Sequence, residues 1–191
     1  MQSNASKPSQ LQTIGAAGFQ VPATLVTSSA EEAESFWQNY GRVIYKSISG
    51  VRSIVRELEA TAARRLPMIT SLPVQFQEYI PGVDIRVHVV GGQCFPARIE
   101  STGIDYRYAH RDGEEPKLEG TNLPQAIADR CVALARTMEL PLAGIDLRLT
   151  PQGTYVCLEV NPMPAYTYYE DHTGLPIGEA IASLLMCPEL A

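Results

Sequence analysis

Apolar and polar residues alternate through two runs near the end of the chain, residues 143–149 and 154–160. Each run has the two-residue period of a β-strand with one buried face. The turn signal Pro151-Gln152-Gly153 separates the two runs. Two alternating runs around such a turn predict a β-hairpin.

The register of this hairpin decides which polar side chains meet. If Thr150 pairs with Gly153 across the turn, Asp146 lies opposite Cys157, and paired residues point to the same face. One face then carries three oxygen-bearing side chains, those of Asp146, Glu159 and Asn161. The other face is expected to be apolar, with Ile145, Leu147, Leu149, Val156, Leu158 and Val160. A slip of one residue would exchange the two faces.

The three oxygen-bearing side chains are a candidate metal site. Oxygen ligands without His or Cys suit Mg²⁺ or Mn²⁺, ions that keep several waters and bind substrate phosphates. Such a site suggests a nucleotide. The alternative is a half-exposed antiparallel sheet whose polar residues face water, and further motifs are needed to choose between the two.

Strands and helices are mixed along the rest of the chain, which indicates an α+β fold with mostly antiparallel strands. Ser29 followed by Glu32 is a capping-box signal, and Gly91-Gly92 marks a second hairpin. Expected strands cover residues 22–27, 42–46, 53–58, 74–80, 83–90 and 93–100, and expected helices cover 30–39, 124–138 and 176–185. The segments 102–120 and 161–173 are expected to be loops.

Composition limits the class of protein. A chain of 191 residues, 45% of them hydrophobic, can form one domain or one domain with two lobes. The net charge of -6, with scattered Lys and Arg, argues against a nucleic-acid partner. The four cysteines lack zinc-ligand spacing and are expected to be reduced and packed. We expect a cytoplasmic protein without a membrane partner, because the sequence has no targeting pattern and no membrane-length apolar run.

Two segments in the first half of the chain are candidates for nucleotide contacts. Lys46 ends an apolar strand before the small-residue loop Ser47-Ile48-Ser49-Gly50, where backbone amides could approach a phosphate. The P-loop spacing is absent, and a solvated lysine is the alternative. The segment Gln77-Glu78-Tyr79-Ile80 runs into Pro81-Gly82. It is either a hinge with backbone groups for a flat heterocycle or an edge strand with a turn.

The strand that follows Pro81-Gly82 carries charged residues on one face. Asp84, Arg86 and His88 share that face, while Ile85, Val87 and Val89 are expected to point to the core. Ligand binding and a cross-strand ion pair explain the charged residues equally well. Further cationic groups in or near the polar loop are Arg98, Arg107 and Arg111. The histidines, His88, His110 and His172, have no partner pattern of a metal site or catalytic triad, so no chemistry is assigned to them.

Six motifs follow one another in order: Gln77-Glu78-Tyr79-Ile80, Asp84-Ile85-Arg86, Val89-Val90-Gly91, Asp105-Tyr106-Arg107, Gly144-Ile145-Asp146 and Glu159-Val160-Asn161. Together they resemble the ATP-grasp superfamily of carboxylate-amine ligases. The most similar branch is that of the RimK-like ribosomal-protein glutamate ligases and the related maturases of graspetide (microviridin-type) peptides. The resemblance extends from about Lys7 to Leu185. It implies an ATP-grasp fold, in which two lobes with mostly antiparallel sheets enclose a nucleotide cleft.

The resemblance implies a role for each matching residue. The magnesium ligands are matched by Asp146, Glu159 and Asn161, with Glu159 bridging two ions. Lysines that contact ATP phosphates are matched by Lys46, with Lys7 as the candidate for a second. The hinge that meets adenine is matched by Gln77, Glu78, Tyr79 and Ile80, and the ribose side of the nucleotide by Asp84. The catalytic arginines facing phosphates or acyl phosphate are matched by Arg86 and Arg107.

The implied activity is an ATP- and Mg²⁺- (or Mn²⁺-) dependent ligation. ATP phosphorylates a substrate carboxylate, and an amine then attacks the acyl phosphate. In the graspetide maturases the attacking group is sometimes a hydroxyl. Charge neutralisation and alignment suffice for such chemistry, so no side-chain nucleophile is required. The expected substrates are a carboxylate and an amine, on an amino acid, a peptide or a peptide side chain.

Three departures from the family pattern concern substrate-facing segments. The glycine-rich phosphate loop is reduced to residues 47–50, Pro162-Met163-Pro164-Ala165 replaces the usual Pro-Gly pair, and Ala109 stands where an Asn is expected two residues after Arg107. Substrate details therefore do not transfer from the family.

The expected domain organisation is a single ATP-grasp domain over residues 1–191. Residues 1–80 form the first lobe and hinge, and residues 81–191 form the C-terminal lobe with the metal site. The α/β domain that precedes this region in the family is expected to be absent. The alternative function is therefore a nucleotide-binding module or truncated domain without independent turnover, which self-association or a partner subunit would complete.

Overall fold

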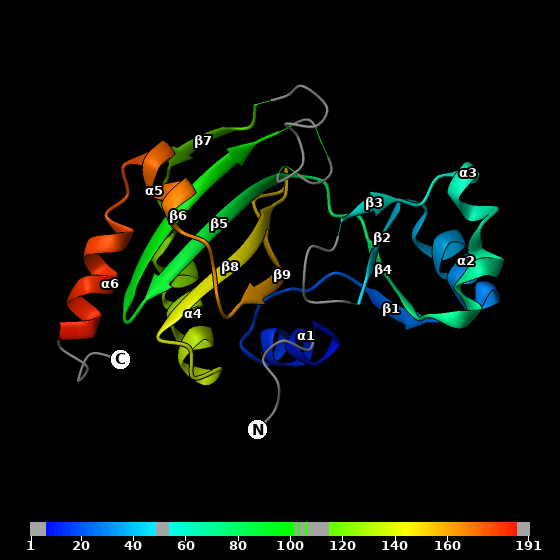
Figure 1. Cartoon of the computed structure of the whole chain (residues 1–191), viewed down its shortest axis with the longest axis horizontal. Helices are drawn as coiled ribbons and strands as arrows, with labels where there is room; N and C mark the ends of the chain where they lie inside the picture. The colour runs from blue at the N-terminus through cyan, green and yellow to red at the C-terminus, as the bar shows by residue number, and fades with distance from the viewer. Residues whose placement is uncertain (1–6, 49–53, 102, 104–105, 107–114, 187–191) are drawn as a thin grey trace. The chain divides into compact units, whose positions relative to one another are not determined.

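The computed structural model describes residues 7–48, 54–101, 103, 106 and 115–186 (Figure 1). Contacts divide these residues into two compact units, each containing an antiparallel sheet. The first unit is built from described residues of 22–80 and of 102–114, and the second from 7–21, 81–101 and 115–186. The predicted α+β fold class is confirmed. The predicted lobes, residues 1–80 and 81–191, differ from these units in two respects, because residues 7–21 group with the second unit and residues 103 and 106 group with the first.

The first unit contains a four-stranded sheet and short helices on its apolar face. Its strands, in sheet order, are β1 (Thr24–Thr27), β4 (Val74–Glu78), β2 (Val43–Ser47) and β3 (Arg56–Glu57). Its helices are α2 (Ala30–Tyr40), α3 (Ala60–Ala63) and the 3₁₀ helix η1 (Leu66–Ser71). The side chains of Val43 and Phe76 pack with Ala33 and Leu66 to form the core of this unit.

Helix α2 begins at the predicted cap. The Ser29 hydroxyl accepts a hydrogen bond from the Glu32 amide at 3.3 Å, and two glutamates lie in the first turn, where the helix dipole favours negative charge. The helix ends at Gly41, which has a φ of 69° and donates its N–H to the Trp37 carbonyl at 2.8 Å.

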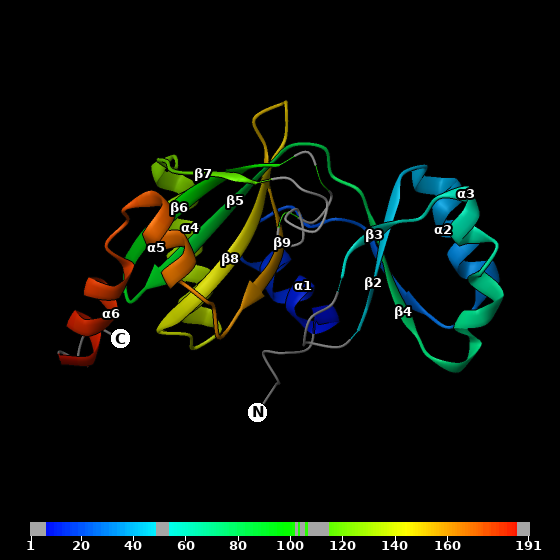
Figure 2. The same ribbon diagram turned by 45° about the horizontal axis from the view of Figure 1, so that its top comes forward.

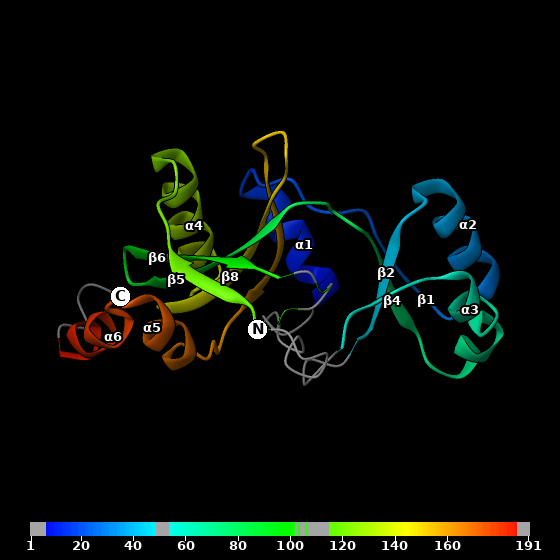
Figure 3. The same cartoon turned by 90° about the horizontal axis from the view of Figure 1, so that it is seen from above.

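The second unit contains a five-stranded antiparallel sheet. Its strands, in sheet order, are β7 (Lys117–Gly120), β6 (Gln93–Glu100), β5 (Val83–Val90), β8 (Leu142–Leu149) and β9 (Tyr155–Asn161) (Figure 2). Its helices are α1 (Lys7–Ala16), α4 (Gln125–Thr137), α5 (Thr167–Thr173) and α6 (Ile177–Met186). Figure 3 shows α1 and α4 on one face of the sheet and α5 and α6 on the other. The central strand β5 is therefore covered on both faces.

The predicted hairpin of residues 83–90 and 93–100 is confirmed as β5 and β6, which pair from Val90 and Gln93 outward. Residues Ile85, Val87 and Val89 face α1 and α4 and form a core with Ile14 and Leu134. The expectation that these three residues point to the core is therefore correct.

The register predicted for the last hairpin is wrong. The Thr150 amide donates to the Thr154 carbonyl at 2.9 Å, and Gly153, with a φ of 82°, supplies the left-handed residue of a longer turn. Leu147 therefore lies opposite Cys157, and a β-bulge between Asp146 and Leu147 then shifts the register again.

The observed register differs from the predicted one in which residues of β9 face the core. Cys157 belongs to the buried core with Leu147, whereas Val156 pairs with Arg148 on the polar face, and Leu158 lies opposite no residue of β8 in this register. The prediction that Val156 and Leu158 share the core face of Leu147 is therefore wrong, although Val156 is buried, with 4% of its surface exposed. Two shifts of one residue restore the alternation at Asp146, which lies opposite Glu159.

Several elements differ from the expected ones. Helix α1 was not predicted, and β7 and α5 lie in segments expected to be loops. The strand expected at residues 53–58 is reduced, within its described part, to the two residues of β3. In the part of the chain that the structure describes, no helix has both the length and the apolar character of a membrane span.

Candidate functional site

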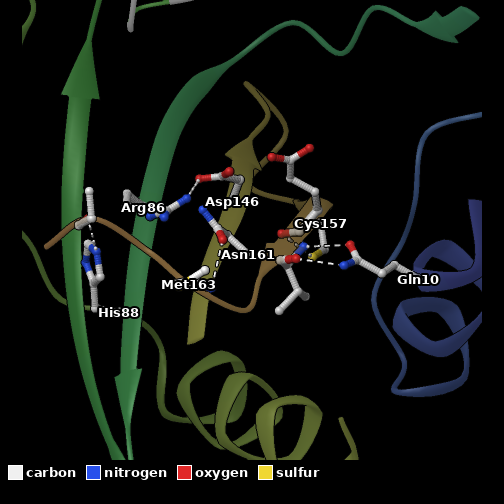
Figure 4. Close-up of polar contacts among 10 residues, drawn as sticks. Gln10, Arg86, His88, Asp146, Cys157, Asn161 and Met163 are labelled. Atoms are coloured by element: carbon white, nitrogen blue, oxygen red, sulfur yellow. Dashed lines mark hydrogen bonds and ion pairs between the residues drawn. The ribbon is translucent and has the colours of Figure 1, made fainter. Parts of the chain in front are cut away.

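Three polar side chains form a row across one face of the five-stranded sheet. Arg86 on β5 lies opposite Asp146 on β8, and Asp146 lies opposite Glu159 on β9. Asn161 lies opposite Gly144 and follows Glu159 at the two-residue spacing that keeps both on the same face. The structure thus places Asp146, Glu159 and Asn161 on one face, as the sequence predicted. Figure 4 shows Arg86 beside Asp146, with Asn161 next to them.

Arg86 and Asp146 form an ion pair. Arg86 Nη1 donates to Asp146 Oδ1 at 2.6 Å, with the arginine side chain 6% exposed and the aspartate 24% exposed. The guanidinium also lies 5.6 Å from the ring centroid of Tyr169 on α5. A buried cation needs such partners because its desolvation is costly. The carboxylate and the ring therefore hold the guanidinium on this face of the sheet.

Gly144 makes room for this arrangement. A Cβ atom at this position would lie 2.6 Å from Arg86 Cζ and 2.7 Å from Cβ of Pro164. Both separations are shorter than any relaxed contact between carbon atoms. Gly144 therefore lets the guanidinium and the loop after β9 approach the backbone of β8.

The loop of residues 162–165 is fastened at both ends. The Asn161 Oδ1 accepts a hydrogen bond from the Met163 amide at 2.9 Å. His88 Nε2 lies 3.1 Å from the Ala165 carbonyl, which accepts, so this nitrogen carries the proton. Figure 4 shows both contacts. The loop that follows the candidate ligand Asn161 is thus fixed against β5.

His88 is fully buried and neutral. Desolvation and the neighbouring Arg86 charge lower its pKa to about 4, against the smaller raising effect of the hydrogen bond to Ala165. Its ring packs at 4.8 Å, edge to face, against Tyr169. The sequence assigned no chemistry to His88, and the structure gives it a positioning contact that a single strand pattern cannot reveal.

A second ion pair lies one row away from the first. Asp84 on β5 lies opposite Arg148 on β8, with Asp84 Oδ1 3.2 Å from Arg148 Nε. Arg148 Nη1 also donates to the Gly82 carbonyl at 3.1 Å. The proposed alternative of a cross-strand ion pair therefore holds for Asp84, and Arg148 is a partner that the sequence did not suggest. This pair fastens the start of β5 to β8.

The donor set fits a hard divalent cation that also binds phosphates. Asp146 and Glu159 offer carboxylate oxygens, and Asn161 offers an amide oxygen that retains a second lone pair. The described residues contain no cluster of three or more His, Cys, Asp and Glu suited to a metal ion. Two carboxylates and an amide leave coordination positions for waters or phosphate oxygens, which is how Mg²⁺ is commonly held beside nucleotides.

Lys46 lies on the polar face of the sheet in the first unit. It pairs with Gln75 on β4, and alternation places Gln77 on that same face, opposite the core face that carries Phe76. All three side chains are buried, with exposures of 7% for Lys46, 1% for Gln75 and 2% for Gln77. A buried lysine among amides is unlike the solvated lysine of the alternative reading.

Two backbone amides of the predicted hinge form hydrogen bonds with neighbouring segments of the chain. The Glu78 amide donates to the Ala23 carbonyl at 2.9 Å, and the Tyr79 amide donates to the Arg42 carbonyl at 3.0 Å. The Arg42 guanidinium lies 3.6 Å from the centroid of the Tyr79 ring. A heterocycle at residues 77–80 would therefore meet backbone groups other than these two amides.

Two residues assigned by resemblance lie outside the described part of the structure. These are Arg107 and the side chain of Lys7, whose backbone begins α1. Their assigned roles therefore remain expectations.

Comparison with known proteins gives one family. The model of the RimK-like ATP-grasp domain matches residues 5–185. The probable alpha-L-glutamate ligase of Pasteurella multocida is 29% identical over 178 residues, covering 87% of this chain and 56% of that protein. The ribosomal protein bS6--L-glutamate ligase of Shigella flexneri is 28% identical, covering 87% of this chain and 58% of that protein.

A solved structure supports the same relationship. The ATP-grasp ligase PsnB, complexed with a phosphomimetic variant of a minimal precursor, Mg and ADP, matches with a TM-score of 0.84 and 30% identity. The match covers 96% of this chain and 58% of PsnB. The chain thus spans less than two thirds of the length of the proteins it resembles.

Proposed function

The chain belongs to the RimK-like ATP-grasp family, and we propose that it acts in ATP- and Mg²⁺-dependent ligation of a carboxylate to an amine through an acyl phosphate. The observation that carries the proposal is the row of Arg86, Asp146 and Glu159, with Asn161 beside it, on one face of a paired sheet. Two relatives that match most of this chain are named as glutamate ligases. Strands position such groups more accurately than loops do.

In this proposal, Asp146, Glu159 and Asn161 hold Mg²⁺, with ATP phosphates supplying further oxygens. When bound, the ion would neutralise charge on the phosphates during phosphoryl transfer. The fit of two carboxylates and an amide to such an ion, and the presence of Mg and ADP in the PsnB complex, support this assignment.

Arg86 is the proposed catalytic arginine. Its guanidinium is held by Asp146 and Tyr169, so few rotamers need to be fixed when an anion arrives. Its Nη1 donates to Asp146 Oδ1, which fixes the plane of the guanidinium. A guanidinium is a planar donor group that suits the oxygens of a phosphoryl group or of an acyl phosphate. Arg107 is proposed for the same task on resemblance alone.

Lys46 and residues 77–80 are the proposed contacts for the rest of the nucleotide. Lys46 is buried on a polar face, so its ammonium group has little contact with bulk water and can donate hydrogen bonds to a phosphate oxygen. Within the hinge, the Glu78 carboxylate accepts from the Ala23 amide at 3.3 Å, so its side chain supports local structure while the backbone meets adenine. Asp84 is proposed to act at the ribose side, from a position fixed by Arg148.

The proposed substrate class is a polypeptide. PsnB was solved with a precursor peptide variant, and the Shigella relative is named for ligating glutamate to a ribosomal protein. A second candidate function is binding of a nucleotide without ligation.

The test is release of ADP and phosphate by purified protein, with and without pools of amino acids, acidic peptides and amine-bearing peptides. Stimulated release with formation of a new amide, identified by mass spectrometry, supports the ligase. Saturable Mg-ATP binding without stimulated release under any pool supports the nucleotide-binding module. Absence of Mg-ATP binding at millimolar concentration rejects both.

A further inference from the structure

Strand β9, which carries Glu159 and Asn161, lies at the edge of its sheet. An edge strand has a row of backbone N–H and C=O groups that no neighbouring strand satisfies. Those groups must find other partners when they are buried. In this chain the partners come from the N-terminal segment, residues 7–21.

Gln10 on α1 satisfies both backbone groups of one residue on this edge. Gln10 Nε2 donates to the Val160 carbonyl at 2.8 Å, and the Val160 amide donates to Gln10 Oε1 at 3.3 Å (Figure 4). A side-chain amide used in this way copies the paired bonds of a neighbouring β-strand. Gln10 is only 5% exposed, so the two bonds are shielded from water.

The residue held by Gln10 lies between the two candidate ligands on β9. Because side chains alternate along a strand, fixing the peptide groups of Val160 fixes the directions of Glu159 and Asn161. Val160 itself points into the core, where it is 2% exposed. The position of both candidate ligands is thus determined from the outer edge of the sheet as well as from β8.

A second contact holds β9 on the other side of its bulge. The Cys157 amide donates to the Gln20 carbonyl at 2.9 Å, beside a parallel bridge between Gln20 and Val156. The bulge at Asp146 and Leu147 interrupts the pairing between these two attachment points. Where the pairing with β8 is irregular, the outer contacts supply the missing constraint.

We propose that Gln10 is a positioning residue for the metal site, acting through Val160 to direct Glu159 and Asn161 toward a magnesium-bound nucleotide. The part of this proposal that concerns metal rests on the proposed function, whereas the part that concerns the strand edge does not. Groups that orient metal ligands typically change metal affinity by about ten- to 100-fold when they are removed. Helix α1 is suited to this task because Ile14 anchors it in the core of the unit.

The test compares Gln10→Met with Gln12→Met in the full chain. Methionine keeps the length and approximate volume of glutamine but cannot form the two hydrogen bonds. Gln12 lies on the same helix with its side chain exposed, so its replacement controls for a change in helix composition. Gln10→Asn withdraws the amide by one methylene group and serves as a second variant if Gln10→Met does not fold.

The first readout is amide hydrogen exchange at Val160, with the Cys157 amide as an internal reference. In Gln10→Met, exchange at Val160 should accelerate by at least about tenfold, while exchange at Cys157 and in Gln12→Met stays within about twofold of wild type. Unchanged exchange at Val160 in a folded Gln10 variant overturns the proposal, whatever the chain binds.

The second readout is the Mg²⁺ dependence of ADP binding. In Gln10→Met, the Mg²⁺ concentration needed for half-maximal enhancement should rise by about tenfold or more, with ADP affinity in EDTA unchanged. An unaltered Mg²⁺ requirement despite faster exchange at Val160 overturns the positioning role. If wild-type protein shows no Mg²⁺-dependent ADP binding, the proposed function fails, and the metal role of Gln10 is overturned with it. The exchange rate at Val160 decides independently whether Gln10 holds the edge of β9.

Discussion

Arg86 and Asp146 are direct neighbours across the adjacent strands β5 and β8, with Arg86 Nη1 2.6 Å from Asp146 Oδ1. The same aspartate is the direct neighbour of Glu159 on β9. One carboxylate therefore lies between a buried guanidinium and a second carboxylate. This placement limits the repulsion between the two acids.

The Arg86–Asp146 pair should contribute measurably to stability. Asp146→Ala leaves the guanidinium without this carboxylate and should lower the free energy of unfolding by about 1.5–3 kcal/mol. Glu57→Ala is the control, because it breaks a pair with Arg42, whose side chain is 51% exposed, and should cost less than about 1 kcal/mol. Urea denaturation of both variants measures the difference. Equal losses would show that the buried pair has no special role.

Gly144 should not tolerate a methyl group. Gly144→Ala places a Cβ against Arg86 Cζ and Pro164, and should destabilise the protein by about 1–3 kcal/mol. Gly15→Ala is the control, because Gly15 lies in α1 with no atom within 4 Å of the new Cβ, and should stabilise by roughly 0.5–1 kcal/mol. Thermal or urea unfolding distinguishes the two. A neutral Gly144→Ala would mean that the loop after Asn161 is not held against β8.

His88 should make stability depend on pH. Its folded pKa of about 4 lies below the ordinary value of 6.5, so between these values the unfolded chain binds a proton that the folded chain does not. The contribution of neutral His88 to the free energy of unfolding is fully present above pH 6.5 and is lost as the pH falls toward 4. Between pH 7 and pH 5 the loss should be about 2 kcal/mol.

The variant His88→Gln removes this titration, so its unfolding free energy should change less over the same pH range than that of wild type. Urea denaturation at pH 7 and pH 5 measures both proteins. A wild-type slope in His88→Gln would show that folding does not lower the pKa of His88.

Lys46 should recognise phosphates and not the nucleoside. Lys46→Ala should weaken the binding of ATP by about 1.5–3 kcal/mol and leave the binding of adenosine almost unchanged, because only the phosphates lose a charge-assisted hydrogen bond. Lys117→Ala is the control, since this lysine is 70% exposed at the start of β7. Calorimetric titration with both ligands measures the effect. An equal loss for ATP and adenosine would assign Lys46 a structural role only.

The sequence predicted elements in which apolar and polar residues alternate. In β5, Ile85, Val87 and Val89 alternate with polar residues before Gly91-Gly92, so the bounds of the hairpin and its core face were found without a structure. The shared face of Asp146, Glu159 and Asn161 was also found, although the register was wrong. The turn and the bulge each shift the pairing by one residue, and two such shifts preserve the face.

Elements stabilised by tertiary contacts were missed. Helix α5 is a short aromatic and acidic segment whose burial comes from Tyr169 packing on His88. Strand β7 contains one buried residue, Leu118, and forms because it pairs with β6. The contact of Gln10 with Val160 joins residues 150 positions apart, and no local pattern marks it.

The central claim is that Asp146, Glu159 and Asn161 together bind Mg²⁺ with a nucleotide, and the most direct test is Mg²⁺-dependent ADP binding by Glu159→Gln. Calorimetry should show ADP affinity in wild-type protein rising by about tenfold or more when Mg²⁺ replaces EDTA. In Glu159→Gln this enhancement should fall below about twofold with the fold intact, while Glu179→Gln, an exposed change on α6, behaves as wild type. Full Mg²⁺ enhancement in Glu159→Gln would contradict the account.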